Sequence, residues 1–205
     1  MNFFRKDYDE NYYNTFLSLF SKFINKRRVS LVLKYKNSGN LLDIGCGTGD
    51  ILSELSKYFS IEGIDISSSA IKIASKKIDK KKLKKIDIES YFLNKKYDII
   101  IAFDVFEHLN NPKKIIKKIY THLTQNGILI FIVPNNYGIL GLIFTKIFNF
   151  MDKTHISTYK RKFWIEFVRN SGFYDFEILN ESIIGFLRND ISKYFTHNLT
   201  IICKK

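Results

Sequence analysis

The amino-acid sequence predicts an α/β protein with a Rossmann-like, doubly wound sheet of mostly parallel strands. From residue 40 onward, short apolar runs alternate with segments in which apolar residues recur at helical spacing. Parallel strands joined by helices produce this alternation. A turn with three glycines (Gly45, Gly47 and Gly49) follows the first apolar run, although the chain has only 10 glycines in 205 residues. Ligands of open α/β sheets bind at such turns.

The central part of the chain predicts five strands, at residues 41–45, 61–65, 83–87, 97–103 and 127–133. Three helices are expected between them, at residues 50–59, 67–78 and 112–123. The run at 97–103 is continuously apolar apart from Asp98, as is typical of a strand that is covered on both faces. The serines at 67–69 can cap the start of the second of these helices, and Pro112 suits the first position of the third.

The flanking segments complete the expected sheet. Residues 12–35 have the apolar spacing of a helix, and a further helix is expected over 160–172, ended by Gly172. Two more strands are expected over about 173–180 and 198–203. Since no clear helix separates these two strands, we expect an antiparallel pair that closes the sheet.

Composition indicates a globular protein, with 45% hydrophobic and 26% charged residues. The net charge is +13, and a basic surface can attract nucleic acid or anionic lipid. The lysines of 75–87 and 112–120, however, alternate with isoleucines at helical spacing. This pattern is typical of solvated helix faces.

The two cysteines, Cys46 and Cys203, do not have the spacing of metal ligands, so we expect reduced, structural thiols and no metal site. The N-terminal residues lack the apolar core of a signal peptide, which favours a cytoplasmic location. The most apolar stretch, residues 137–151, is too short to span a membrane and contains Lys146.

The glycine turn reads G-x-G-x-G, which matches neither the dinucleotide pattern G-x-G-x-x-G nor a P-loop. Asp43 and Asp50 flank it, and two carboxylates repel phosphate but suit a cation. The next strand ends in Asp65, where an acid can accept hydrogen bonds from ribose hydroxyls. A ligand with an ammonium group, a sulfonium and a ribose fits these residues.

Three motifs carry a family resemblance: LLDIGCGTGD (41–50), IEGIDIS (61–67) and YDIIIAFDVFEHL (97–109). They resemble, in order and spacing over about residues 40–135, the class I S-adenosylmethionine-dependent methyltransferases. The likeness is strongest to small-molecule enzymes such as the O-methyltransferases of ubiquinone biosynthesis, and 152–173 resembles their late segment. The resemblance implies S-adenosylmethionine as cofactor and a seven-stranded sheet with one antiparallel strand near the C-terminus.

The resemblance also implies cofactor contacts. Asp43, Gly45 and Gly47 would surround the methionine moiety, and Cys46 and Gly49 belong to the same contacting stretch. Asp65 would hold the ribose, with Ile66 against the adenine. Asp87 would accept from the adenine amino group and Ile88 would cover the ring. Asp104 would stand near the amino-acid end or the methyl group.

Methyl transfer to a hydroxyl also needs a base, for which histidine suits neutral pH. His108, after the strand at 97–103, and His155 are the two catalytic candidates. Each has a structural alternative, since His108 could support a turn and His155 could anchor a loop. His122 and His197 are expected to play no part.

We therefore expect a single domain over 1–205, with an N-terminal helical cap (1–38), a cofactor-binding core (39–135) and a substrate-side lid with closing strands (136–205). The lid would combine residues 137–151 with Tyr8, Tyr12 and Tyr13 and could grip a hydrophobic small-molecule acceptor or touch a membrane surface. Two alternatives stay open: a nucleic-acid methyltransferase, and a non-catalytic binder of S-adenosylmethionine. The acceptor and the oligomeric state stay undetermined.

Overall fold

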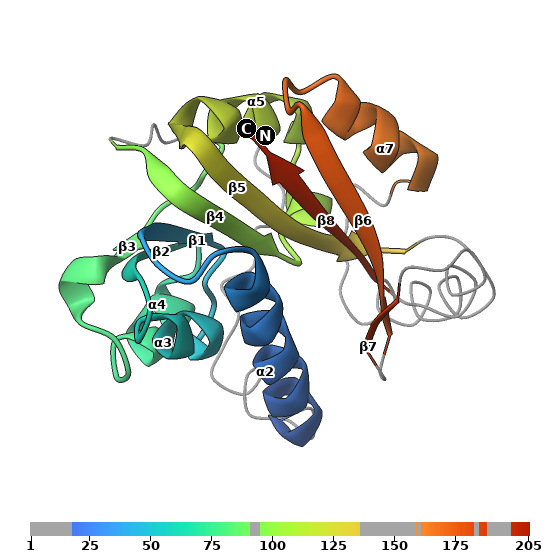
Figure 1. Ribbon diagram of the computed structural model, residues 1–205. Coiled ribbons are helices and arrows are strands. Elements are labelled where there is room, and N and C mark those ends of the chain that lie inside the picture. The colour runs from blue at the N-terminus through green and yellow to red at the C-terminus, as the bar shows by residue number, and fades with distance from the viewer. Residues whose placement is uncertain (1–17, 91–94, 136–158, 160, 183–184, 188–197) are drawn as a thin grey trace. The chain divides into compact units, whose positions relative to one another are not determined.

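The computed structural model describes residues 18–90, 95–135, 159, 161–182, 185–187 and 198–205 (Figure 1). The chain forms two compact units, residues 1–101 and 102–205. Each unit is described in turn. Within the described residues, no helix is long and apolar enough to cross a membrane.

The first unit contains a parallel sheet. Strand β1 (Asn40–Ile44) pairs with β2 (Ser60–Asp65) on one side and with β4 (Tyr97–Phe103) on the other. Strand β3 (Leu83–Lys85) pairs in parallel with β2. Nearly every residue of β1 and β4 is buried, which confirms the prediction of strands covered on both faces.

Three helices and a short 3-10 turn belong to the first unit: α2 (Ser18–Tyr35), α3 (Asp50–Leu55), α4 (Ser68–Ala74) and η1 (Lys80–Lys82). Helices α2 and α3 contact each other. The Ser67 hydroxyl accepts a hydrogen bond from the Ala70 N–H at 3.2 Å and caps α4, as predicted. Helix α3 instead has Gly49 at its N-cap, with a left-handed backbone and no side-chain cap.

The second unit contains the antiparallel part of the sheet. Strand β8 (Asn198–Lys204) lies between β5 (Leu123–Pro134) and β6 (Asp175–Ser182) and is antiparallel to both, as the arrows of Figure 1 show. A short strand, β7 (Gly185–Leu187), pairs with the end of β6. The strand order is β3-β2-β1-β4-β5-β8-β6-β7. Apart from β7, this is the predicted Rossmann-like sheet with one antiparallel strand.

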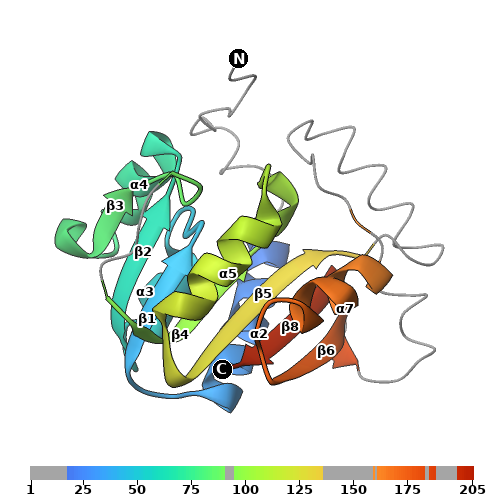
Figure 2. The same ribbon diagram turned by 90° about the horizontal axis from the view of Figure 1, so that it is seen from above.

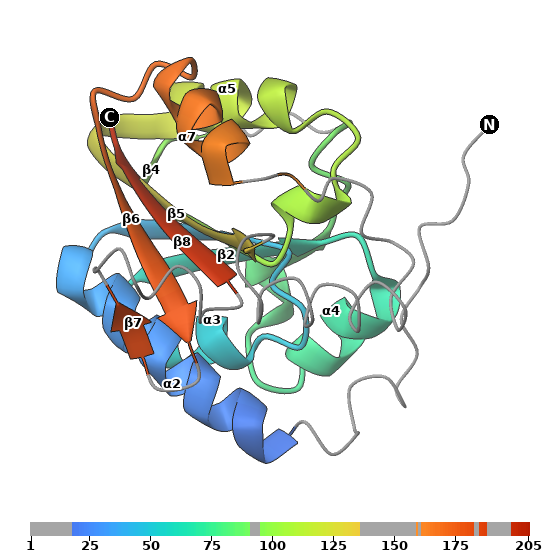
Figure 3. The same cartoon turned by 90° about the vertical axis from the view of Figure 1, so that its right-hand side faces the viewer.

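Helices α5 (Pro112–His122) and α7 (Arg161–Arg169) lie side by side on one face of the second unit's strands (Figures 2 and 3). Asn111 caps α5 by accepting from the Lys114 N–H at 3.1 Å. The isoleucines of α5 are buried and its lysines 113, 114 and 117 are exposed. The prediction of a solvated lysine face is confirmed for this helix.

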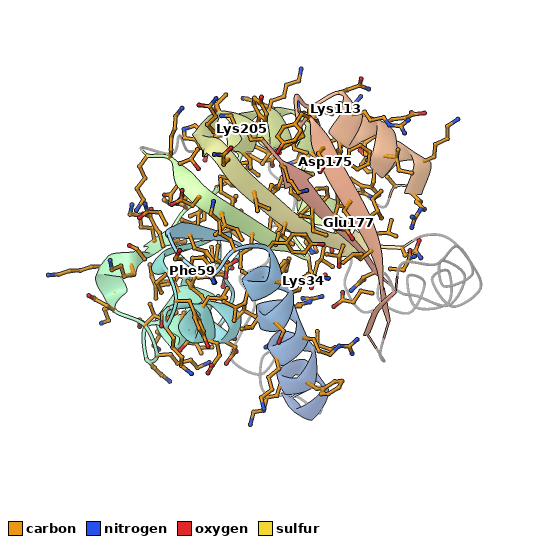
Figure 4. All side chains as sticks on the ribbon, viewed as in Figure 1. Lys34, Phe59, Lys113, Asp175, Glu177 and Lys205 are labelled. Carbon is orange, nitrogen blue, oxygen red and sulfur yellow. The ribbon has the colours of Figure 1, made fainter. Side chains whose placement is uncertain are left out.

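Lys205, the residue after β8, links this strand to the end of α5 by hydrogen bonds. Its ammonium donates to the backbone carbonyls of Tyr120 and Leu123 at 2.7 and 3.0 Å and lies 4.6 Å from the centre of the Tyr120 ring. Figure 4 marks Lys205 beside this end of the sheet, together with Asp175, which pairs with Lys204 at 2.7 Å.

Several element boundaries differ from the predicted ones. The helices expected over 50–59, 67–78 and 160–172 are shorter, because each ends in turns that the apolar spacing does not reveal. Strand β3 ends at Lys85, two residues early. Strand β5 begins at Leu123, directly after α5, so residues 123–126 are strand. The predicted division of a single domain at residues 38 and 135 stays a prediction.

Candidate functional site

The glycine turn after β1 is shaped by three left-handed residues. Gly45, Gly47 and Gly49 have φ angles of 73°, 52° and 75°. The N–H groups of Gly45 and Cys46 both donate to the Ile64 carbonyl, at 2.8 and 3.0 Å. The turn is thereby held against the end of β2, in a conformation that favours glycine.

Two of the glycines differ in what a side chain would meet. A Cβ atom on Gly47 would have no heavy atom of the described residues within 4 Å, so among these residues the position is open. A Cβ atom on Gly49 would lie 2.9 Å from the Ala74 Cβ and 3.0 Å from Ile78. Gly49 is therefore needed for packing against α4, whereas at Gly47 only the backbone angle, and no neighbour among the described residues, disfavours a side chain.

The Asp65 side chain links the end of β2 to the glycine turn that follows β1. One carboxylate oxygen accepts the Gly47 N–H and the other accepts the Ser67 N–H, both at 2.8 Å. The side chain is half-buried at the carboxyl end of β2. A carboxylate oxygen can accept more than one hydrogen bond, and a ribose hydroxyl is a donor of the kind it accepts. Ser67 thus contacts this carboxylate through its backbone, a contact that the prediction of a serine helix cap did not include.

Asp43 is a buried carboxyl group, with 4% of its surface exposed. Burial raises the pKa of Asp43 well above its usual range, and the nearby charge of Asp65 raises it further. A cation placed beside the two acids would favour their ionised forms. The other flanking acid, Asp50, pairs instead with Lys77 at 2.7 Å, so Asp43 and Asp65 are the acids suited to a cationic ligand.

Asp43→Asn should stabilise the cofactor-free protein near neutral pH. The pKa of Asp43 is higher in the folded than in the unfolded state, so the free energy of unfolding falls as pH rises from the unfolded-state pKa to the folded-state pKa. Asparagine does not ionise and therefore avoids this loss of stability. The same change should weaken S-adenosylhomocysteine binding by roughly ten- to a hundredfold, because a charge-assisted contact is lost. Thermal melts with and without the ligand measure both effects; a lower ligand-free Tm together with a full ligand shift contradicts this role of Asp43.

The expected adenine side has a turn at the end of β3. The Ile86 N–H donates to the Asp65 carbonyl at 2.8 Å, which places the ends of β2 and β3 together. The Asp87 carboxylate accepts the Glu89 N–H at 2.9 Å. Ile88 is 6% exposed, whereas Ile66 is 37% exposed. An apolar side chain as exposed as Ile66 beside Asp65 is available to contact a ring.

Both cysteines are buried free thiols, as predicted. Burial, followed by the charges of Asp43 and Asp65, raises the pKa of Cys46. Its sulfur lies 3.0 Å from where a Cβ on Gly63 would stand, so Gly63 makes room for it. This second packing glycine was missed from the sequence because it lies within a strand. Among the described residues, no cluster of His, Cys, Asp and Glu could hold a metal ion.

In the second unit, Asp104 follows β4 with a φ of 57°, which makes it the one described residue other than glycine with a positive φ. Its N–H donates to the Ile132 carbonyl at 3.1 Å. The following 3-10 turn, η2 (Phe106–His108), buries Glu107 to 1% exposure and leaves His108 half-buried. A strained residue at a strand end is typical of functional sites.

Some predicted site residues lie outside the described part of the chain. These are His155, the apolar stretch 137–151, and Tyr8, Tyr12 and Tyr13. The described predictions therefore fall into two groups, one in each unit: the acids and glycines at the ends of β1, β2 and β3, and Asp104 with His108 after β4.

The sequence matches the family described as "Methyltransferase domain" over residues 13–178. A malonyl-[acyl-carrier protein] O-methyltransferase of Bacillus cereus is 36% identical over 96 residues, which are 44% of this chain and 36% of that protein. A ubiquinone biosynthesis O-methyltransferase of Rickettsia typhi is 36% identical over 95 residues, 44% of this chain and 39% of that protein. The chain thus spans little more than a third of the length of these relatives.

The fold has solved counterparts. A SAM-dependent methyltransferase from Archaeoglobus fulgidus superposes with a TM-score of 0.75 at 20% identity, covering 95% of this chain and 100% of that one. The plantazolicin methyltransferase BpumL, solved with S-adenosylhomocysteine (SAH), gives 0.69 at 19% identity, over 95% and 88% of the two chains. From this match to the family, the chain belongs to the class I S-adenosylmethionine-dependent methyltransferases.

Proposed function

We propose that this methyltransferase acts on a hydroxyl oxygen of a small-molecule acceptor. The observation that carries the cofactor half of the proposal is the pair Asp43 and Asp65 beside the open position of Gly47. These residues would hold the amino-acid and ribose parts of S-adenosylmethionine. When bound, this cofactor supplies an activated methyl group, so the chain's task is chiefly to align the acceptor oxygen.

The choice of oxygen and of a small acceptor rests on two observations. The relatives that match the central part of the chain are named as O-methyltransferases. The segment after β4, FDVFEHL (103–109), also lacks the [DNS]-P-P-[YFW] pattern of enzymes that methylate the exocyclic amines of bases. The free, buried thiols of the two cysteines favour a cytoplasmic location as part of this proposal.

The net charge of +13 supports a nucleic-acid substrate less strongly than the observations above support a small-molecule acceptor. Lys113, Lys114 and Lys117 of α5 and the lysines of residues 76–85 are exposed around buried isoleucines and leucines, as expected for solvated faces. Salt-dependent binding to RNA, with a steep loss between low and moderate ionic strength, would support this alternative. If the protein shows no binding to RNA even at low ionic strength, the nucleic-acid alternative is wrong.

His108→Ala should lower kcat on a hydroxyl acceptor by roughly a hundredfold or more and leave SAH affinity unchanged, because general-base contributions have this size. His108 is half-buried on η2, four residues after Asp104, whose φ is positive. His122, whose Nδ1 lies 2.8 Å from the Lys118 carbonyl on α5, offers a matched control, and His122→Ala should keep full turnover. Full turnover in both His108→Ala and His155→Ala would mean that neither histidine is the base.

The direct test is SAH release from purified protein over a panel of phenols, carboxylic acids, lipid quinone precursors and transfer RNA. Release with hydroxylated small molecules supports the proposal. Release with RNA alone, or SAH binding without release in any reaction, replaces it with one of the two alternatives.

A further inference from the structure

The glycine turn after β1 packs directly against the end of α4. A Cβ atom on Gly49 would lie 2.9 Å from the Ala74 Cβ and 3.0 Å from the Ile78 side chain. The chain continues in turns after α4, and there the Lys77 N–H donates to the Ala74 carbonyl at 2.9 Å. The close approach at Gly49 therefore brings the side chain of Lys77 within reach of the glycine turn.

Lys77 makes two hydrogen bonds to this turn. Its ammonium donates to the backbone carbonyl of Thr48 at 3.2 Å and to one carboxylate oxygen of Asp50 at 2.7 Å. The other Asp50 oxygen accepts the Thr48 hydroxyl at 2.5 Å. A side chain from the end of α4 thus connects the backbone of the turn to the first residue of α3.

The turn is therefore held at two successive residues by side chains from two different elements. Gly47 donates its N–H to Asp65 at the end of β2, and Thr48, the next residue, is bound through its carbonyl by Lys77. Thr48 lies between two glycines, which can adopt many backbone conformations when nothing restrains them. Fixing Thr48 before a ligand arrives lowers the conformational entropy that the turn loses on binding.

The pair of Lys77 and Asp50 is suited to a local role. Burial opposes ionisation of Asp50, but the hydrogen bonds from Lys77 and Thr48 outweigh it and lower the pKa of Asp50, which keeps the carboxylate ionised at neutral pH. The side chains of Lys77 and Asp50 are 37% and 48% exposed. An ion pair this exposed adds little to the free energy of unfolding of the whole protein. Its loss should therefore change the turn and not the fold.

We propose that Lys77 is a positioning residue for S-adenosylmethionine, which holds Thr48 in the conformation of the glycine turn that receives the cofactor beside Gly47. Lys77 acts through the backbone of the turn and needs no contact with the cofactor. This inference rests on the cofactor half of the proposed function, because it requires the cofactor to lie at this turn.

The test is calorimetric binding of SAH to the full chain. Lys77→Gln should raise the Kd about three- to tenfold, because the turn then spends a smaller fraction of time in the conformation that binds. The ligand-free Tm should change by no more than about 2 °C, since the pair is exposed. Lys77→Arg keeps a cationic donor for both acceptors and should restore the Kd to within about twofold of the wild-type value.

Lys76→Gln is the matched control. Lys76 is the exposed neighbour of Lys77 in the same turn, and its replacement changes the net charge of the protein by the same amount. This variant should bind SAH like the wild type. A double variant with Lys77→Gln and Asp50→Asn should bind SAH hardly more weakly than Lys77→Gln alone, because the two side chains act as one unit.

The inference is overturned if Lys77→Gln binds SAH like the wild type, if Lys76→Gln weakens binding equally, or if Lys77→Arg restores nothing. A fall of the ligand-free Tm by more than about 5 °C in Lys77→Gln also contradicts it, because the role of Lys77 would then be structural. If Asp65→Ala weakens SAH binding and Lys77→Gln does not, the cofactor lies at the turn and only this inference fails. If neither change affects binding, the cofactor half of the proposed function fails instead.

Discussion

Asp65→Ala should weaken SAH binding by about 1–3 kcal/mol, roughly five- to 150-fold in Kd, because charge-assisted bonds to the ribose are lost. The carboxylate that is removed also accepts the N–H groups of Gly47 and Ser67 at 2.8 Å, so the glycine turn loses one of its hydrogen bonds to the end of β2. Both effects weaken the binding of the cofactor. Isothermal calorimetry with SAH measures the change directly.

Asp65→Asn separates the two contributions, since an amide oxygen can still accept one backbone N–H but carries no charge. A control on the same strand is Glu62→Gln, because Glu62 pairs with Lys84 and Lys95 at 2.8 and 3.1 Å and has no predicted contact with the cofactor. The control should bind SAH like the wild type. Unchanged affinity in Asp65→Ala would overturn the assignment of this acid to the ribose.

Gly47→Val should abolish detectable SAH binding while the protein stays folded. The side chain would project into the open position beside the turn, where no atom of the part of the chain that the structure describes lies within 4 Å of the added Cβ. The cost to the fold is the strain of a left-handed φ of 52°, about 1–2 kcal/mol or somewhat more for a β-branched residue. Far-UV circular dichroism and a thermal melt measure the fold, and calorimetry measures binding.

Gly49→Ala, two residues further on, should show the reverse pattern. Its Cβ would stand 2.9 Å from the Ala74 Cβ, so α4 must shift, at a cost of about 1–3 kcal/mol on top of the backbone strain. We expect a lower Tm and nearly normal SAH affinity in the molecules that remain folded.

Normal SAH binding by Gly47→Val would show that the open position does not face the cofactor.

Much of the fold could be predicted because periodicity and glycine placement are local properties of the chain. The continuous apolar runs predicted β4 and β5, and the missing helix in the C-terminal third predicted the antiparallel β8. Helix ends were less predictable. The turns after Leu55 and Ala74 depend on packing against the sheet, which apolar spacing does not encode.

The candidate site shows the same division. Motif order pointed to Asp43, Asp65 and Gly47, and their geometry suits the predicted roles. Sequence alone could not separate Gly47 from Gly49, since the packing contact that explains Gly49 comes from a residue 25 positions away. Nor could it find the bond from Lys77 to the Thr48 carbonyl, which forms only when the end of α4 packs against the glycine turn.

The measurement that tests the central claim most directly is a crystal structure of the protein soaked with SAH. We expect density for the ligand beside Gly47, with the ribose hydroxyls on Asp65 and the amino-acid end toward Asp43. A map from crystals soaked at saturating SAH that shows no ligand beside Gly47 and Asp65, or shows the protein's own side chains there, would contradict the account.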